Sequence, residues 1–288
     1  MKRKLFVVSD IHGGYNYLIE SLKQVNYDEN DSNSILICCG DMFDRLEQSK
    51  EVYTYLKGLS DKGKAICLRG NHETFLIDFL EGKDCSFNFM HNGFNKTLDS
   101  FLSEQDSWKH FIEIISDQNK NKKDKIKLYG SRVSTIIDEF NSIPSEITFN
   151  IFQEYAREKI NKEFPELLSW LKSRLYYCET ENYIFTHGAI DGLCEDWHNP
   201  IYTPYDFWSP WEYLTWDDGN FYKQDIINTN KTVVVGHFHT DAIRERFHIP
   251  ISGNNSILIS EDKRKIFIDT CTVITHKVNV LILEDDLI

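Results

Sequence analysis

Short, uninterrupted apolar segments alternate with amphipathic helical patterns through the first third of the chain. The apolar segments cover residues 5–8, 34–39 and 65–68. Between them, apolar residues recur at the spacing of one helix face, as in the series from Tyr15 through Leu18 to Leu22. A strand that is apolar along its whole length has both faces buried, which is typical of parallel sheets covered by helices. The alternation therefore predicts an α/β fold.

The rest of the chain changes character twice. Residues 84–175 carry helical patterns and few strand signals, and they include a lysine-rich run at 117–127 that we expect to be a solvated loop. Strand patterns return at 183–186, 232–235, 257–259, 265–269 and 278–283, and we expect the last three to form an antiparallel meander. We therefore predict one domain over residues 1–288. It would be a two-sheet β-sandwich flanked by helices, with a helical insertion or cap at 84–175.

Composition excludes several classes of protein. With 288 residues, of which 41% are hydrophobic and 27% charged, the chain can build a large core, unlike a disordered, collagenous or disulfide-scaffold protein. The formal net charge of −13 repels nucleic acid and anionic lipid, so we expect neither as a partner. Seven cysteines without a C-x-x-C pair, and no apolar run long enough for a signal peptide or a membrane span, predict a cytoplasmic protein.

Polar residues that can do chemistry follow directly after five of the predicted strands. They lie in the segments 9–13, 40–45, 69–73, 186–188 and 236–239. Each has a structural explanation when taken alone: Asp10 as a helix N-cap, for example, or His187 as a buried, hydrogen-bonded histidine. The carboxyl ends of strands, however, converge on one crevice in α/β sheets. So many carboxylates and imidazoles would remain unpaired there unless a divalent cation bound them.

These segments resemble the motifs of a known family, the calcineurin-like metallophosphoesterases. The motifs are Asp10-x-His12-Gly13, Gly40-Asp41-x-x-Asp44-Arg45, Gly70-Asn71-His72-Glu73, His187-Gly188 and Gly236-His237. The second and third are typical of the phosphoprotein phosphatase branch, and the segment 91–94 with Thr97 is similar to its bacterial serine/threonine phosphatases and diadenosine tetraphosphatases. The resemblance implies an α/β/β/α sandwich and a dinuclear metal centre.

The resemblance also implies a ligand for each metal position. Asp10 and His12 would bind the first ion, Asp41 would bridge, and Asn71, His187 and His237 would bind the second. His239 occupies the place where the wider superfamily has a further ligand of the first ion, although the phosphatase branch often lacks it. The expected cofactor is two divalent metal ions, with Mn²⁺ as the first choice and Fe, Zn, Ni or Co as alternatives.

Catalytic roles follow from the same resemblance. A hydroxide that bridges two cations about 3.5–4 Å apart would attack phosphorus. His72, held by Asp44, would protonate the leaving alkoxide, and Arg45 would bind a phosphate oxygen. Arg69 is either a second substrate contact or a structural residue. The arginine that the family commonly supplies near Trp216 is absent from this chain.

The leading functional hypothesis is a hydrolase that removes phosphate from phosphoserine or phosphothreonine in proteins. The alternative is a symmetrical bis(5'-nucleosyl)-tetraphosphatase, which has the same metal site; a nuclease, or a non-catalytic scaffold on the same fold, fits the residues less well. The substrate would be a phosphorylated protein or a small phosphoester. Aromatic residues are dense between 197 and 222, where they form either a substrate wall or the packing of a proline-bounded loop. They include Trp197, Phe207, Trp208, Trp211 and Trp216.

Overall fold

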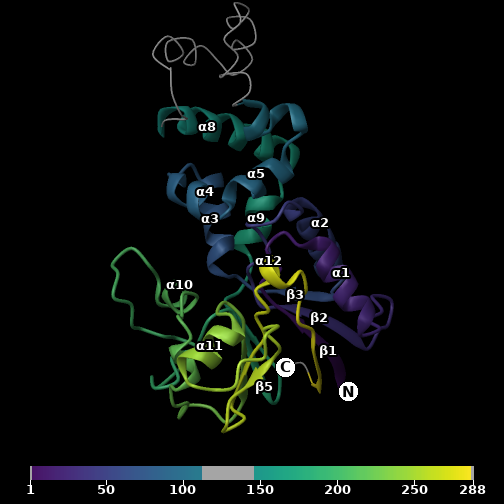
Figure 1. The fold of residues 1–288 in the computed structure, drawn as a ribbon, viewed down its shortest axis with the longest axis vertical. Coiled ribbons are helices and arrows are strands. Elements are labelled where there is room, and N and C mark those ends of the chain that lie inside the picture. The colour runs from purple at the N-terminus through teal and green to yellow at the C-terminus, as the bar shows by residue number, and fades with distance from the viewer. Residues whose placement is uncertain (1, 112–145, 287–288) are drawn as a thin grey trace, which may run out of the picture.

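Two β-sheets pack face to face, with helices against their outer sides (Figure 1). The computed structural model describes residues 2–111 and 146–286. The first sheet has the strand order β3-β2-β1-β9 and consists of β1 (Arg3–Val8), β2 (Ser34–Cys38), β3 (Ala65–Cys67) and β9 (Leu281–Asp285). The first three of these strands are parallel, and β9 runs antiparallel to β1.

The second sheet has the order β4-β5-β6-β8-β7. Its strands are β4 (Tyr177–Glu179), β5 (Tyr183–Thr186), β6 (Thr232–Val235), β7 (Leu258–Ile259) and β8 (Lys265–Phe267). The central strands β5, β6 and β8 are parallel, while the edge strands β4 and β7 are antiparallel to their neighbours. The predicted two-sheet α/β fold is thus confirmed.

Side chains of β1 alternate between two cores, which explains why this strand is apolar from Leu5 to Val8. Leu5 and Val7 point to the second sheet and pack with Phe185 and Val234. Phe6 and Val8 point the other way, into a cluster that helices cover. These helices include α1 (Tyr15–Gln24), α2 (Ser49–Asp61) and α3 (Asn71–Leu80). On the far side, α11 (Thr240–Arg246) covers the second sheet, and its Ile243 packs in that sheet's outer core.

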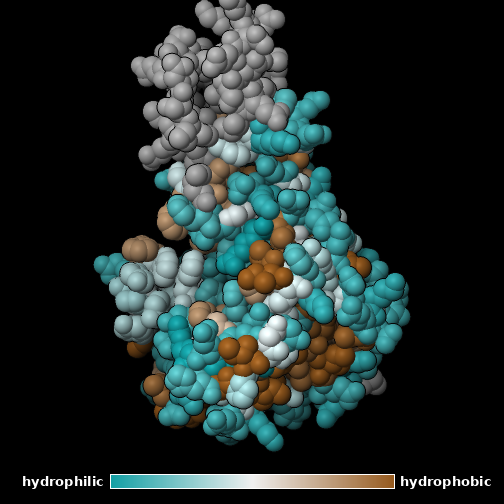
Figure 2. Space-filling model, in the orientation of Figure 1, coloured by the Kyte–Doolittle hydropathy of each residue, from teal (hydrophilic) through white to brown (hydrophobic). Residues whose placement is uncertain are grey.

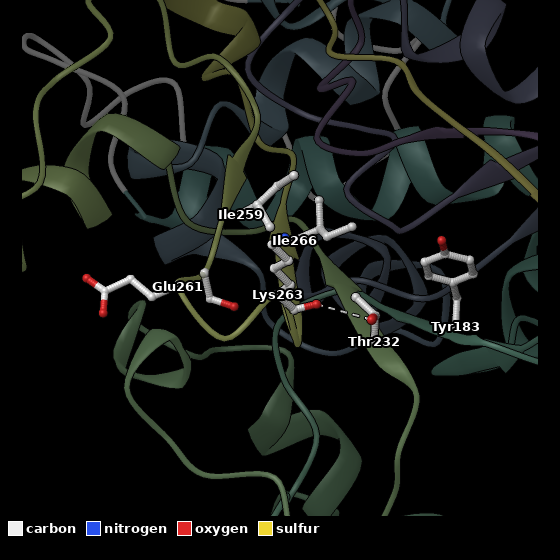
Figure 3. Close-up of a pocket in the computed structure, with 7 residues that line it drawn as sticks. Tyr183, Thr232, Ile259, Glu261, Lys263 and Ile266 are labelled. Carbon is white, nitrogen blue, oxygen red and sulfur yellow. Dashed lines mark hydrogen bonds between the residues drawn. The ribbon is translucent and has the colours of Figure 1, made fainter.

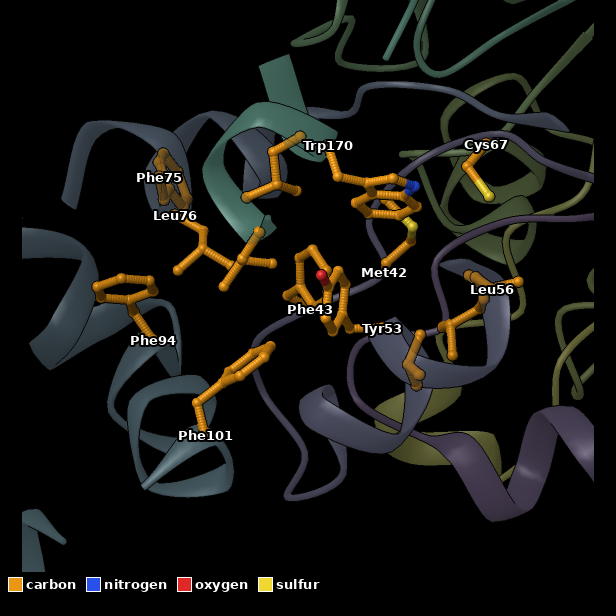
Figure 4. Close-up of a cluster of buried hydrophobic side chains, with 14 of the residues drawn as sticks. Met42, Phe43, Tyr53, Leu56, Cys67, Phe75, Leu76, Phe94, Phe101 and Trp170 are labelled. Atoms are coloured by element: carbon orange, nitrogen blue, oxygen red, sulfur yellow. The ribbon is translucent and has the colours of Figure 1, made fainter. Parts of the chain in front are cut away.

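The helical segment shares its core with the first sheet. Its described elements are α4 (Ser86–His91), α5 (Phe94–Phe101), a 3-10 turn at Glu104–Asp106, α8 (Glu146–Glu163) and α9 (Leu167–Lys172). Phe94, Phe101 and Trp170 pack in one cluster with Phe43 and Tyr53 (Figure 4). We therefore propose that residues 84–175 are an insertion in a single domain. Residues 112–145, with the expected loop at 117–127, lie outside the described residues.

The prediction of a meander from the last three strands was wrong. Strands β7 and β8 do form an antiparallel pair, but β9 joins the first sheet, with Asp285 opposite Arg3. The connection contains α12 (Thr272–Thr275) and leads across to β1, where Leu281 and Leu283 add apolar surface to the core between the sheets. Among the described residues, no helix combines the length and the apolar character that crossing a bilayer requires.

Candidate metal centre

The loops that follow five strands bring their polar side chains to one buried place. Many of these residues have a left-handed backbone, which side chains other than glycine rarely adopt. They are Asp10 (φ 53°), His12 (φ 50°), Asp41 (φ 53°), Asp44 (φ 72°), Arg45 (φ 65°) and His237 (φ 64°). Such turns redirect the chain directly after a strand, so that the side chains point across the sheet edge rather than along the strands.

Asp41 lies between two groups of possible ligands. Its Oδ1 is 3.2 Å from Nε2 of His187, whereas its Oδ2 is 3.7 Å from Nε2 of His12. The backbone N–H of His72 donates to Oδ1, which fixes the carboxylate. Because its two oxygens face different groups, the geometry supports the expected bridging position of Asp41.

The expected ligands of the second ion surround Nε2 of His187. This nitrogen lies 2.9 Å from Oδ1 of Asn71 and 3.2 Å from Nδ1 of His237. Burial by itself lowers the pKa of His187, but Asp41 and other carboxylates outweigh it and raise that pKa to about 10. For His237, burial and then the charge of His187 lower the pKa to about 3. Because Nε2 of His187 lies within 3.2 Å of the other two donor atoms, Asn71, His187 and His237 are close enough to share one cation.

The expected ligands of the first ion are also adjacent. Nε2 of His12 lies 3.9 Å from Oδ1 of Asp10, and that oxygen is buried without a hydrogen-bond partner. The other oxygen of Asp10 accepts a hydrogen bond from the backbone of His237. Burial raises the pKa of Asp10 to about 6. An unpaired buried carboxylate oxygen is costly without a cation, so its presence here fits a metal site.

Backbone carbonyls fix which imidazole nitrogen faces the centre. Nδ1 of His12 lies 2.9 Å from the carbonyl oxygen of Phe43, and Nδ1 of His187 lies 2.9 Å from that of Cys39. Because a carbonyl only accepts, each Nδ1 donates, and in the neutral imidazole Nε2 keeps its lone pair for a cation. Imidazole, carboxylate and amide donors together fit two divalent first-row metal ions.

His239 lies at the margin of this centre. Its side chain is 38% exposed, and its Nε2 is 3.8 Å from Oδ2 of the buried Asp269. Neither compact group of candidate ligands contains it; these groups are His12 with Asp41 and His72, and Asp41 with His187 and His237. A ligand role for His239 therefore remains a prediction. The segment 267–270 also resembles the family's sequence, but the sequence analysis gave Asp269 no role. Burial and the charge of Asp10 raise the pKa of Asp269 well above its ordinary value.

His72 and Asp44 form a tight buried pair beside the centre. Their Nδ1 and Oδ2 atoms are 2.6 Å apart, and both side chains are almost completely buried. Burial lowers the pKa of His72, but the charges of Asp41 and Asp44 more than compensate, so the pKa is raised. Thr97 in turn holds Asp44: its hydroxyl donates to Oδ1 and accepts from the backbone N–H.

Arg45 points its guanidinium at the same histidine. Its Nη2 lies 3.5 Å from Nε2 of His72. Its backbone packs directly on Gly93, where a Cβ atom would lie only 2.6 Å from the N and Cα atoms of Arg45. Gly93 also has a φ of 75°, so glycine suits this position for two reasons.

Glu73 is a functional candidate to which the sequence analysis gave no role, although it ends the Gly-Asn-His-Glu motif. Its fully buried carboxylate accepts hydrogen bonds from the backbone N–H groups of Asp41 (2.8 Å), Met42 (2.8 Å) and Gly70 (2.7 Å). Burial raises the pKa of Glu73 to about 7. Glu73 thus joins the loop after β2 to the loop after β3.

Arg69 makes contacts that favour the structural alternative. Its guanidinium donates to the hydroxyl of Tyr176 and to the carbonyl of Lys172, at 3.1 and 3.0 Å. Its role in substrate binding therefore stays a prediction.

An open pocket of about 410 Å³ lies elsewhere, near the amino ends of β5 and β6 (Figure 3). There Thr232 donates to the carbonyl of Lys263, and none of the predicted site residues lines the pocket.

Comparison with known families matches residues 3–250 to the family model described as calcineurin-like phosphoesterase. The chain belongs to the calcineurin-like phosphoesterase family. Its motifs are consistent with the phosphoprotein phosphatase branch of that family.

Curated relatives of this phosphoesterase match over limited segments. Serine/threonine-protein phosphatase 2 of Salmonella typhimurium is 33% identical over 92 residues, which are 32% of this chain and 39% of the relative. A symmetrical bis(5'-nucleosyl)-tetraphosphatase of Colwellia psychrerythraea is 35% identical over 78 residues, 27% of this chain and 26% of the relative. The chain thus spans about a quarter to two fifths of the length of these relatives.

A solved structure supports the fold over almost the whole chain. The cold-active protein-tyrosine phosphatase of a psychrophilic Shewanella species superposes with a TM-score of 0.51 at 15% identity, over 98% of this chain and 75% of that one.

Proposed function

We propose that this phosphoesterase is a metal-dependent phosphomonoesterase that removes phosphate from serine or threonine side chains of proteins. The observation that carries the proposal is the buried pair of Asp44 and His72, with Arg45 beside it. Serine alkoxide is a poor leaving group and needs a proton as the bond to phosphorus breaks. A nucleotide that leaves from a dinucleoside polyphosphate departs as a stable phosphate anion and needs no such acid.

The proposed roles follow from the geometry. Asp10, His12, Asp41, Asn71, His187 and His237 hold two divalent ions, with Mn²⁺ as the proposed metal and His239 as a further proposed ligand. When bound, the ions supply an activated water and neutralise charge on the phosphate. Arg45 donates to a phosphate oxygen through its planar guanidinium. His72 acts as an imidazolium: Asp44 accepts the hydrogen bond from its Nδ1, Asp41 and Asp44 raise its pKa, and Nε2 then carries the proton that the leaving alkoxide takes.

A second candidate is a symmetrical bis(5'-nucleosyl)-tetraphosphatase. The 35% identity to such an enzyme over 78 residues favours it. A third candidate, a non-catalytic scaffold, would not need side chains that can bind a metal to lie as close together as Asp41, His187 and His237 do. We also propose a reducing, cytoplasmic location, which is supported by the seven cysteines, all of them free thiols.

A substrate panel tests the two enzymatic candidates directly. The Mn²⁺-loaded protein is incubated with a phosphoserine peptide and, separately, with diadenosine tetraphosphate. We expect release of inorganic phosphate from the peptide at the higher kcat/KM. Release of ADP from diadenosine tetraphosphate without turnover of any phosphopeptide would refute the protein phosphatase proposal.

The His72→Asn variant tests the proposed acid. We expect it to bind metal as the unaltered protein does and to lose kcat by about 10²–10⁴-fold on alkyl phosphates. On nitrophenyl phosphate, whose leaving group needs no proton, the loss is expected to be much smaller. Equal losses on both substrates would contradict the assignment of His72.

A further inference from the structure

A continuous series of aromatic rings leads from the metal centre to the surface. Trp216 lies 5.9 Å from the ring of His237 and stacks on Trp208 at 5.8 Å with an interplanar angle of 5°. Tyr205 follows at 5.0 Å from Trp208, and Phe207 lies 5.5 Å from Tyr205. Tyr202 and Tyr213 continue the contacts. We call these six residues the aromatic strip.

Much of the aromatic strip is open to solvent. The exposed fractions are 77% for Phe207, 61% for Tyr202, 44% for Tyr205 and 37% for Trp216. The sequence left two explanations for these aromatic residues open, a substrate wall and the packing of a proline-bounded loop. Internal packing does not account for rings this exposed. In Figure 2 the segment that carries the aromatic strip, residues 202–216, forms a lobe at the left, separated by a hollow from the helices above it.

The lobe is a built structure rather than a loose loop. Its helix α10 (Pro210–Leu214) begins with a capping box, in which Ser209 and Glu212 satisfy each other's backbone N–H groups, and with a proline at the first turn. Trp216 is further held against Phe75 of α3, at 5.8 Å between ring centroids. The rings are thus presented at a fixed distance from the metal centre.

Charge decides what the aromatic strip can attract. Between Arg174 and Lys223 the chain has no lysine or arginine but nine aspartates and glutamates. Asp206, which lies between Tyr205 and Phe207 in the sequence, is exposed. Burial, the neighbouring tyrosines and the carboxylates of Asp217 and Asp218 raise the pKa of Tyr213. Two cations lie beside this part of the chain: Arg246 forms an ion pair with Asp218 at 3.4 Å, and Lys83 interacts electrostatically with Glu212.

Exposed ring faces with adjacent carboxylates attract cations and repel polyphosphates. A lysine or arginine side chain over such a ring gains about 0.5–1 kcal/mol when exposed and about 2 kcal/mol when desolvated, which corresponds to roughly 2- to 30-fold in binding. The strip begins beside His237, so a residue bound to it would lie a short distance along the peptide from the phosphorylated residue.

We propose, resting on the protein phosphatase function proposed above, that the aromatic strip binds basic side chains next to the phosphorylated residue of a substrate protein. This phosphatase then selects phosphoserine or phosphothreonine in a basic sequence context. Arg45, together with the proposed metal ions when they are bound, would attract the phosphate at one end, and the acidic aromatic lobe would attract lysine or arginine at the other.

The experiment compares three phosphoserine peptides that differ only at two flanking positions, which carry arginine, alanine or glutamate. We expect kcat/KM to be about 2- to 30-fold higher for the arginine peptide than for the alanine peptide, and lowest for the glutamate peptide. Phe207→Ala and Phe207→Leu should both reduce the ratio of arginine to alanine peptide, because leucine keeps apolar area without a ring face. Ile227→Ala, at a site 73% exposed outside the strip, is the matched control and should leave the ratio unchanged.

Two results overturn the inference while leaving the proposed function in place. One is turnover of all three peptides at similar kcat/KM, and the other is an arginine preference that both Phe207 variants retain. Failure to turn over any phosphopeptide, together with hydrolysis of diadenosine tetraphosphate, overturns the proposed function and the inference with it.

Discussion

Replacing Thr97 by valine removes one hydroxyl group from a fully buried position. Thr97 and Asp44 are both fully buried, and the hydroxyl donates to Oδ1 of Asp44 at 2.5 Å. It also accepts from the backbone N–H of Asp44 at 2.8 Å. A hydrogen bond to a charged group contributes about 1.5–3 kcal/mol, and an orphaned buried N–H costs about 1–3 kcal/mol. We therefore expect valine to lower the free energy of unfolding by roughly 3–5 kcal/mol.

The matched control is Thr97→Ser, which keeps the hydroxyl and loses one methyl group, at a cost of about 1 kcal/mol. Urea unfolding of both variants measures the difference. Activity gives a second readout, because Asp44 orients His72 through a 2.6 Å contact. Valine should reduce kcat on a phosphoserine peptide far more than on nitrophenyl phosphate, whereas serine should affect both slightly. Equal stability of the two variants, or equal losses on both substrates with valine, would refute this reasoning.

Three further predictions concern the loops and the metals. Gly93→Ala should destabilise the protein by more than 2 kcal/mol and lower kcat/KM, because its Cβ would overlap the backbone of Arg45. Gly63→Ala, which has a similar φ of 66° but open space, should cost only about 1 kcal/mol by urea unfolding, and equal costs would contradict the steric argument. Glu73→Gln should weaken metal binding about 10- to 100-fold in a competition titration, because the Glu73 carboxylate accepts hydrogen bonds from the backbone of Asp41 and Gly70 and so positions the proposed ligands. Unchanged metal affinity would exclude this positioning role for Glu73. Finally, the pKa of His187 near 10 keeps it protonated at pH 7 in the metal-free protein, so metal binding must release protons and tighten as pH rises. Calorimetry in buffers of different ionisation enthalpy measures this release, and affinity independent of pH between 6 and 8 would contradict it.

Local patterns in the sequence were sufficient to predict most of the strands and the neighbourhood of the centre. The runs that became β5 and β6 are apolar and bounded by polar residues, so their limits were predicted to the residue. Because parallel strands end at one edge of a sheet, the residues after β2 and β3 were expected to meet, as Asp41 and His72 do.

Features that depend on distant partners could not be predicted from local patterns. All three residues of β4 are partly exposed, as suits an edge strand, and so they form no apolar run. Strand β9 pairs with β1, at the other end of the chain, and its own apolar pattern does not reveal that distant partner. Thr97 and Glu73 act through hydrogen bonds to backbone or side-chain atoms of other loops, which motif spacing does not reveal.

The left-handed turns of the centre have a consequence for how this protein can evolve. Such a conformation costs a residue other than glycine about 1–2 kcal/mol, with Asp and His at the lower end, so six of them oppose folding by roughly 6 kcal/mol or more. That is comparable with the whole stability of many domains, about 5–15 kcal/mol. The loops are held in place by contacts such as those of Glu73 and Thr97. Selection for activity and selection for stability therefore act in opposite directions at these positions, and a descendant released from catalysis would gain stability by replacing these six residues with glycine or asparagine.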